Sequence, residues 1–503
     1  MLSTNRREAL QFLIAAGGMA GLPAIAGAAG EDPVFAAYQR NAEQDPWTLI
    51  VRDAPADGFS GDAQLIHGQM PSGLSGTLYR NGPGRFSRQG WRYRHWFDGD
   101  GFIQSWQLAN GRVSHRGQFT QTDKWVEEEA AGRFLRPGFG SLPPGASGLN
   151  GPDDMNVANT SVMLVGDELL ALWEGGSAWS LDPETLESRG PRRWGQGLDG
   201  VPFSAHPKVE PQTGIVWNFG QDAFNDRLVI WKIGPDGQLL DAGLIPDIPG
   251  GMVHDFVITE RSLVFLVGSY RYQGRADTFN GSFGFEAGTP MLAVALDKND
   301  WSQRRTWELD PGFLFHFGGA WESADGEIRL DAALSDDARM VSQGAQMIMR
   351  GEPEGEFGSH TQHRLVTLGA GGRARSEVLG PDYIEFPQVD PRFVGRRRRQ
   401  TWHIAWSEAD ERGATRIERR DLETGTQDGF DHGEHVFVEE PLFLPSERGA
   451  EGEGWVIHTA LNARDRRTEL HVFDALRLSD GPLASWQLPY ACPFGFHGCW
   501  RQA

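Results

Sequence analysis

Short apolar stretches separated by turn signals recur along almost the whole of this 503-residue chain, and they limit what it can fold into. After about residue 45, runs of about five to seven apolar residues alternate with polar or Gly-containing turns, and no long run has helical periodicity. Examples are ELLALWEGGSAWSLDPETLES, GIVWNFGQDAFNDRLVIWKIGPDGQLL, SLVFLVGSYRY, MLAVALDKNDW, TWHIAWSEADERGATRIERRDLETG and GWVIHTALNARDRRTELHVFDAL. Each such segment reads as an apolar strand, a turn and a second strand.

Repetition of this unit, with roughly 40 to 50 residues per four-stranded sheet, predicts an all-β chain folded as a β-propeller. A stacked pair of β-sandwiches is the competing architecture. The 65 Gly and 29 Pro supply the turns and the 18 Trp supply a large core, so a disordered chain is excluded. Because no low-complexity linker divides it, we expect residues 31–503 to form a single domain.

The first thirty residues are typical of a targeting segment. The pair Arg6-Arg7 precedes a weakly apolar Gly/Ala-rich stretch that ends in small residues at 24–28. This pattern resembles a twin-arginine export signal and predicts a periplasmic or otherwise exported protein that crosses the membrane folded. An ordinary N-terminal helix is the alternative. The apolar stretch is too short and too Gly-rich for a membrane span.

The charge balance excludes nucleic acid as a partner. The chain has 68 Asp and Glu against 47 Lys and Arg, which gives a net charge of −21. This charge repels nucleic acid phosphates, and it leaves no polybasic segment that would bind anionic lipid. The run GRRRRQ at 395–400 is a local exception, which we interpret as a solvated loop or strand edge. Peripheral membrane contact through an apolar patch, and the oligomeric state, stay open.

Four of the fourteen histidines lie among apolar and Gly residues with almost no charge beside them. They are His206, His254, His316 and His497, separated by 48, 62 and 181 residues. These spacings are about one, slightly more than one, and three to four propeller units, and the innermost strands of a propeller line its axis. The pattern favours a metal on the axis, for which imidazole suits Fe, Zn, Cu or Ni. The alternative is that each is a hydrogen-bonded core histidine.

Four neutral imidazoles leave the charge of a divalent ion uncompensated, so carboxylates should accept the other ring N–H of the ligands. Three glutamates have apolar flanks: Glu174 in LALWEGG, Glu385 in YIEFPQV and Glu440 in FVEEPLFLP. Such flanks indicate burial, and a buried carboxylate needs a partner. An ordinary carboxylate at a strand end is the alternative.

An ordered series of motifs resembles the carotenoid cleavage oxygenases, the family that also holds retinal-pigment isomerases and lignostilbene dioxygenases. The series comprises GTLYRNGPGRF, YRHWFDGDGFIQSW, ANTSV, LLALWEGG, AHPKVEPQTG, VHDF, IEFPQVD, EEPLFLP and the terminal FHGCW. It runs from about residue 76 to the end of the chain, and the combination is more specific than any one piece.

The resemblance implies a seven-bladed β-propeller with loops forming a cap over the active site. It implies one non-haem Fe(II) per subunit, held on the axis by His206, His254, His316 and His497. It places Glu174, Glu385 and Glu440 behind these ligands and implies no catalytic side chain beyond the metal centre. These seven residues are the same ones that spacing and flanks had selected.

The chain also departs from the family pattern. Relatives commonly carry a second His and an Asn after the third ligand, whereas this chain reads FHFGGAWE, so the polar surroundings of the metal differ there. Members that act on phenolic stilbenes are expected to grip the phenol with a Tyr and a Lys. Tyr93 and Lys124 lie in the matching region and are candidates for this role, but we favour the interpretation that Tyr93 is a packed residue and Lys124 an exposed surface residue.

The C-terminal residues Cys492, His497 and Cys499 have a spacing that, taken locally, suits a zinc site or a redox pair. If His497 belongs with the other three histidines, the thiols are neighbours and not ligands, and we expect small buried apolar residues. A Cys492–Cys499 disulfide is the alternative in an exported protein.

The resemblance therefore implies an enzyme, a dioxygenase that uses dioxygen to cleave a C=C bond of a carotenoid or apocarotenoid to aldehyde or ketone products. The first alternative is the same chemistry on a lignin-derived stilbene or phenylpropenoid. A second, from another class, is a propeller without metal that binds a partner or carbohydrate. The chain shows no Rossmann-type glycine fingerprint beside a βαβ unit, so no nicotinamide or flavin is expected.

Overall fold

The computed structural model describes residues 31–353, 358, 360–407, 410 and 412–503, and strands make up most of its regular structure. The predicted export segment, residues 1–30, lies outside these residues. Within the described part of the chain, no helix combines the length and the hydrophobicity needed to cross a membrane.

Three sheets each consist of four antiparallel strands taken from consecutive parts of the chain. The first holds β7 (Ser161–Val165), β8 (Glu168–Leu172), β9 (Trp179–Leu181) and β10 (Ser188–Pro191). The second holds β11 (Lys208–Val209), β12 (Val216–Asp222), β13 (Arg227–Ile233) and β14 (Leu239–Pro246). The third holds β15 (Phe256–Ile258), β16 (Ser262–Val267), β19 (Met291–Asp297) and β20 (Arg304–Leu309), with the hairpin β17 (Tyr270–Tyr272) and β18 (Phe283–Phe285) inserted.

Two larger sheets complete the architecture. Seven strands in chain order form one of them: β21 (Phe313–Glu322), β22 (Ile328–Ser335), β23 (Gln362–Leu368), β24 (Ala374–Gln388), β25 (Gln400–Trp406), β26 (Arg416–Asp421) and β27 (Gln427–Asp431). The ten-stranded sheet holds β1 (Phe59–Gly68), β2 (Gly76–Arg85), β5 (Asp100–Ala109), β6 (Arg112–Phe119), β28 (Val436–Val438), β29 (Leu442–Pro445), β30 (Gly454–Asn462), β31 (Arg467–Asp474), β32 (Ala484–Gln487) and β33 (Gly498–Gln502). The short pair β3 (Ser87–Arg88) and β4 (Trp91–Arg92) stands apart.

Helices are short and connect the strands. The α-helices are α2 (Pro33–Gln44), α3 (Asp123–Ala131) and α4 (Ala345–Met349), and the π-helix η8 (Met340–Gly344) precedes α4. The 3₁₀ turns are η3 (Pro46–Val51), η4 (Trp96–Asp98), η5 (Pro152–Met155), η6 (Ala223–Asn225), η7 (Asn280–Ser282), η10 (Pro391–Phe393) and η11 (Leu478–Asp480). The start of α2 follows from its sequence, because Pro33 takes the first helical position and the Asp32 carboxylate accepts from the Val34 and Phe35 N–H groups.

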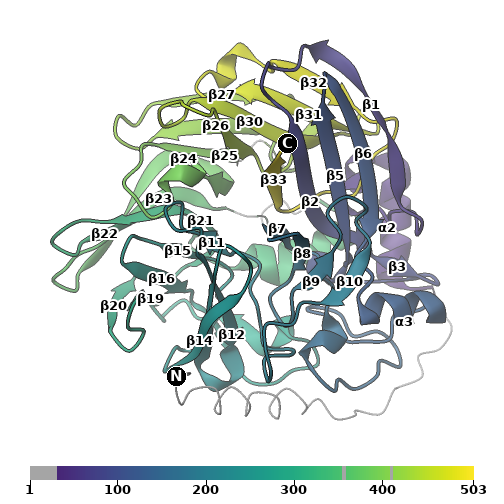
Figure 1. Cartoon of the computed structure of the whole chain (residues 1–503). Coiled ribbons are helices and arrows are strands. Elements are labelled where there is room, and N and C mark those ends of the chain that lie inside the picture. The colour runs from purple at the N-terminus through teal and green to yellow at the C-terminus, as the bar shows by residue number, and fades with distance from the viewer. Residues whose placement is uncertain (1–30, 354–357, 359, 408–409, 411) are drawn as a thin grey trace.

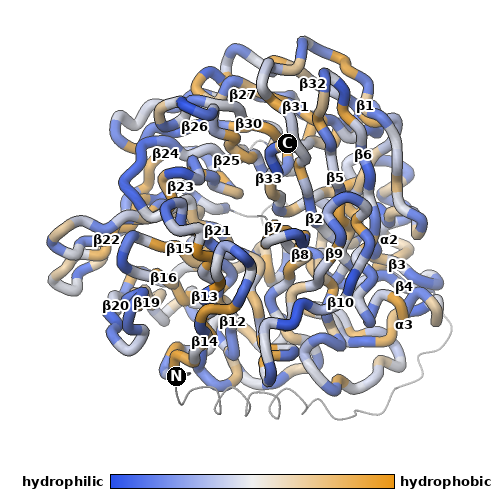
Figure 2. The backbone as a smooth tube through the Cα atoms, viewed as in Figure 1, coloured by the Kyte–Doolittle hydropathy of each residue, from blue (hydrophilic) through white to orange (hydrophobic). Residues whose placement is uncertain are grey.

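The sheets lie around a common centre (Figure 1), and apolar side chains fill the spaces between neighbouring sheets. Phe219 on β12 packs against Phe265 on β16 with ring centroids 5.4 Å apart, and Trp402 on β25 stacks on Phe443 of β29 at 4.2 Å. Hydrophobic stretches lie along the strands between sheets, whereas many turns at the rim are hydrophilic (Figure 2). The predicted all-β propeller architecture is confirmed; the number of seven blades and the single-domain boundary at residue 31 stay predictions.

Strands from the two ends of the chain close the ring. The last strand, β33, pairs with β2 over five residue pairs, from Gly76↔Gln502 to Arg80↔Gly498. In the same sheet β1 pairs with β6 on one side and with β32 on the other. His497 immediately precedes β33, so its position depends on this closure.

Truncation after His497 tests that dependence. Removing residues 498–503 keeps all four candidate ligands but deletes β33 and its pairing with β2. We expect the melting temperature to fall by several degrees, because each lost hydrogen bond contributes about 1 kcal/mol, and the bound metal measured by mass spectrometry to fall with it. Removal of Ala503 alone is the control and should change neither quantity. Full metal content in the longer truncation would contradict the dependence.

Candidate metal centre

Each of the four candidate histidines lies on, or within two residues of, a different strand. His206 precedes β11, His254 precedes β15, His316 lies on β21 and His497 precedes β33. On β21 the register with β22 shifts between Leu314 and Phe317, so a bulge re-aims the side chain of His316 toward the centre. The four histidines, which follow one another at intervals of 48, 62 and 181 residues, come together at one point.

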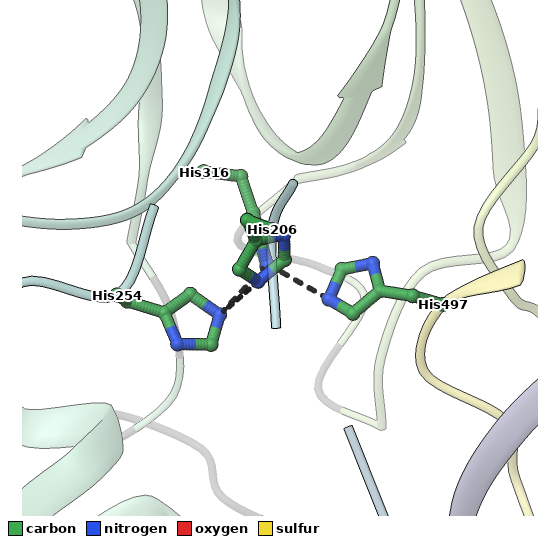
Figure 3. Close-up of side chains that lie close together, drawn as sticks. All are labelled: His206, His254, His316 and His497. Carbon is green, nitrogen blue, oxygen red and sulfur yellow. Dashed lines mark hydrogen bonds between the residues drawn. The ribbon is translucent and has the colours of Figure 1, made fainter. Parts of the chain in front are cut away.

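The Nε2 atoms of the four imidazoles converge (Figure 3). The separation of Nε2 atoms is 2.9 Å between His206 and His254, 3.2 Å between His254 and His316, and 3.1 Å between His316 and His497. Neighbouring ligands on a metal at about 2.1 Å stand about 3.0 Å apart when they subtend a right angle. The four rings are each only 7–8% exposed.

Glutamates contact three of these rings at Nδ1, the ring nitrogen that points away from the common centre, as the sequence predicted. Nδ1 of His316 lies 2.5 Å from Glu385 Oε2, and Nδ1 of His497 lies 2.8 Å from Glu440 Oε1. Glu174, in the turn after β8, contacts Nδ1 of His254 through Oε1. Among the described residues no carboxylate pairs with His206 in this way.

The hydrogen-bond pattern fits a cation at the point where the Nε2 atoms meet. A neutral imidazole that donates its Nδ1–H to a glutamate presents a bare lone pair at Nε2. The lone pairs of His316 and His497 then face each other at 3.1 Å, an arrangement that is repulsive unless a positive charge lies between them. The residues present therefore fit a divalent metal with imidazole ligands.

Protonation states agree with this interpretation. Burial lowers the pKa of both His206 and His497 well below its usual range, so both rings are neutral at pH 7 and can act as ligands. Burial also opposes charge on His254, but the Glu174 carboxylate outweighs it and the pKa of His254 is raised. Glu174 thus favours a positive charge on the His254 ring, and a metal bound at Nε2 would take the place of that proton.

Two residues that the sequence analysis missed hold Glu440. The fully buried Arg80 donates from Nη1 to Glu440 Oε2 at 3.3 Å and from Nη2 to the Glu440 carbonyl at 2.8 Å, and Gln388 donates to Oε1 at 2.8 Å. Burial raises the pKa of Glu440 to about 7, and Arg80 opposes that rise. Both residues stand in the motifs LYRNGPG and IEFPQVD, and that was the only signal that pointed to them.

A cavity of about 410 Å³ opens on three of the histidines, His254, His316 and His497. Phe315, Phe386 and Phe496 line it beside the metal site, and Phe386 packs its ring within 5.0 Å of His316 and 5.1 Å of His497. Other apolar residues continue the wall: Trp47, Ile50, Trp96, Phe97, Phe139, Leu149, Trp173, Phe219, Phe224, Phe279, Ile348, Phe437 and Phe494. Such a lining places an apolar ligand mainly by shape.

Tyr93 and Lys124 contact each other but do not line this cavity. Lys124 is 2% exposed and donates from Nζ to Tyr93 Oη at 2.9 Å, Asp100 Oδ1 at 2.7 Å and Glu128 Oε2 at 2.8 Å. The prediction that Lys124 is exposed is wrong, because two carboxylates offset the cost of burying its charge. Its three donors are all used within this cluster.

The remaining sequence features have structural roles. Cys492 is buried, Cys499 is partly buried, and both thiols are free, so the disulfide alternative is not realised. Phe317, which directly follows His316, is 2% exposed and packs in the core beside β22. In the arginine run Arg398 is buried against Asp331, while Arg397 and Arg399 both pair with Glu423.

Comparisons with known proteins show the family of the chain. The sequence model of one protein family, described as RPE65, retinal pigment epithelial membrane protein, matches residues 56–502. The chain is 29% identical to an apocarotenoid-15,15'-oxygenase of Synechocystis over 93% of this chain and 99% of that protein. It is 28% identical to lignostilbene-alpha,beta-dioxygenase isozyme III of Sphingomonas paucimobilis, over 91% of this chain and 96% of that protein.

Solved structures show the same fold. Cobalt-substituted Synechocystis ACO superimposes with a TM-score of 0.82 and 27% identity, covering 91% of this chain and 98% of that one. The lignostilbene dioxygenase of Pseudomonas brassicacearum superimposes with a TM-score of 0.77 and 25% identity, covering 88% of this chain and 95% of that one.

Replacing any one of the four histidines by Ala should remove the metal. Each change deletes a ligand and leaves the other lone pairs converging on an incomplete site. Metal content after anaerobic loading with Fe(II) should fall from about one per chain to a small fraction, measured by plasma mass spectrometry. His67→Ala, on the exposed face of β1, is the control and should keep its metal. Unchanged metal in the His497→Ala protein would contradict the site assignment.

Proposed function

We propose an activity for this chain on the ground that it belongs to the RPE65 family, the retinal pigment epithelial membrane proteins. The proposed activity is that of a dioxygenase, which cleaves a C=C bond of a carotenoid or apocarotenoid to aldehyde or ketone products. The observation that carries the proposal is the convergence of four imidazole Nε2 atoms at the wall of an apolar cavity. The alignment with the apocarotenoid oxygenase covers 93% of this chain and 99% of that protein.

Fe(II), one per subunit, is the metal we propose for His206, His254, His316 and His497. Four imidazoles suit several divalent first-row metals, so the choice of iron rests on the family's oxygenase chemistry and not on the donor set alone. When bound, Fe(II) supplies the activation of dioxygen that cleavage of an alkene requires.

The chain's own residues have three tasks in this activity. Glu174, Glu385 and Glu440 fix the tautomer and orientation of three ligand rings through their contacts with Nδ1. The aromatic wall of the cavity excludes water and holds a long apolar chain so that one double bond lies beside the metal. Phe315 and Phe386 border that position most closely, since both contact ligand rings.

A lignin-derived stilbene or phenylpropenoid is the second candidate substrate, supported by the 28% identity to a lignostilbene dioxygenase. A phenol would need a polar grip inside the cavity, and the two residues expected to supply it form a closed cluster elsewhere. We therefore rank the polyene first. A binding propeller without metal is disfavoured by the converging lone pairs of the four histidines.

Export through the twin-arginine pathway to the periplasm remains our proposal for localisation. It is supported by Arg6-Arg7 and the small residues that follow at 24–28. A route that carries folded proteins suits a chain that must acquire its metal before it crosses the membrane.

Product analysis tests the proposed activity. Iron-loaded protein incubated in air with carotenoids, apocarotenals and stilbenes should yield aldehyde or ketone fragments from a polyene, identified by mass spectrometry with ¹⁸O₂ as the oxygen source. The His254→Ala protein is the control, because it lacks a ligand but keeps the cavity. Products from stilbenes alone would favour the second candidate. No labelled product from any alkene would overturn the proposal.

Glu385→Gln should separate metal retention from rate. The amide can still accept a hydrogen bond from His316 Nδ1 but carries no charge, so most of the iron should stay bound while the turnover falls about 10- to 100-fold. Glu377→Gln changes an exposed carboxylate on the same strand, β24, and should leave both quantities unchanged. A Glu385→Gln protein with normal turnover would show that the carboxylate charge does not tune the site.

A further inference from the structure

His206 is held differently from the other three ligands. Within the described residues its Nδ1 has no carboxylate partner, whereas His254, His316 and His497 each lie against a glutamate. Its backbone N–H reaches only the Ser204 hydroxyl, at 3.5 Å. A ligand ring must be held to within a few tenths of an ångström for tight metal binding, so something else must position this one.

An ion pair lies two residues beyond His206. Lys208, on the short strand β11, places Nζ 2.8 Å from Asp255 Oδ1, and the Asp255 side chain is only 2% exposed. The Lys208 side chain is 21% exposed, so its ammonium approaches the buried carboxylate from the rim of the site. Because the carboxylate is buried, this charge-assisted contact is stronger than a surface ion pair.

Asp255 also contacts the segments that carry two other ligands. It directly follows His254, and its Oδ1 accepts from the Phe256 N–H at 2.7 Å. Its Oδ2 accepts from the N–H of Phe317 at 3.0 Å, and Phe317 directly follows His316. One carboxylate thus joins the backbone beside His254, the backbone beside His316 and the side chain of Lys208.

We propose that the Lys208–Asp255 ion pair is the positioning device for His206, in the place of the glutamate that this ligand lacks. Through β11 it fixes the distance between His206 and the strands that carry His254 and His316. Lys208 and Asp255 are positioning residues and touch neither substrate nor metal. The inference rests on the metal centre proposed above and extends it to the one ligand that no glutamate supports.

The test measures how fast metal leaves the site. Wild-type and variant proteins are loaded with Co(II), whose absorption spectrum reports ligand geometry, and are then mixed with excess chelator. Lys208→Met keeps the length of the side chain and removes its charge, and it should release metal about tenfold faster with a shifted spectrum, in line with the effect of losing a ligand's hydrogen-bond partner. Lys208→Arg restores a cation beside Asp255 and should return both readouts toward the wild type.

A matched control separates positioning from general stability. Arg399 forms an ion pair with the buried carboxylate of Asp421, 2.6 Å from Nη2 to Oδ2, and neither residue lies beside a ligand or on β11. Arg399→Met should lower the melting temperature of the metal-free protein but leave the release rate and the Co(II) spectrum unchanged. In the double variant Lys208→Met/Asp255→Asn the increase in release rate should be smaller than the product of the two single effects, because both substitutions break the same ion pair.

Wild-type release kinetics and spectrum in the Lys208→Met protein would overturn this inference and leave the proposed function intact. Equal acceleration by Arg399→Met would overturn it as well, since the loss of any ion pair to a buried carboxylate would then suffice. A wild-type protein that binds no metal at all would overturn the metal centre itself.

Discussion

The fold holds four imidazole rings close together although the lone pairs of their Nε2 atoms repel one another. Three glutamates take the Nδ1–H groups of their histidines, so the Nε2 atoms of these rings can only present electron pairs to one another. Four rings at this separation would move apart in a flexible chain. They stay together because each lies on, or just before, a different strand, and close packing of the apolar layers between the sheets fixes the positions of those strands.

The polar groups around the ligands form two systems. In the first system the glutamates contact the Nδ1 atoms of the rings, and Arg80 balances the negative charge of Glu440. Arg80 and Glu440 are 360 residues apart in sequence. In the second system Asp255 accepts hydrogen bonds from backbone N–H groups beside two ligands. The cavity in front of the rings is lined by aromatic residues, so a strongly polar centre borders an apolar space. That contrast suits a reaction on an apolar alkene more than one on a charged substrate.

The four histidines and three glutamates could be predicted from sequence because an ionisable residue amid apolar neighbours is a local signal. The partners of these residues could not, because they depend on pairing between distant strands: nothing near Lys208 in sequence indicates that Asp255 lies 2.8 Å away. Lys124 was misjudged for a similar reason, since its partner Asp100 lies on β5 whereas Lys124 lies on α3. The extent of the sheets was also hidden. β24 continues through Gly380 and Pro381, where a local interpretation places a turn, and so joins two groups of strands in one sheet.

The closure of the ring by β33 has a consequence for folding. β33 pairs with β2, and these two strands come from opposite ends of the described residues. Because the pairing joins segments far apart in sequence, closing the loop between them is costly in entropy, and we expect it to form late. The first three ligands can converge before that step, but His497 joins them only when β33 has paired. A complete set of four ligands is therefore found only in a chain whose sheets have all formed.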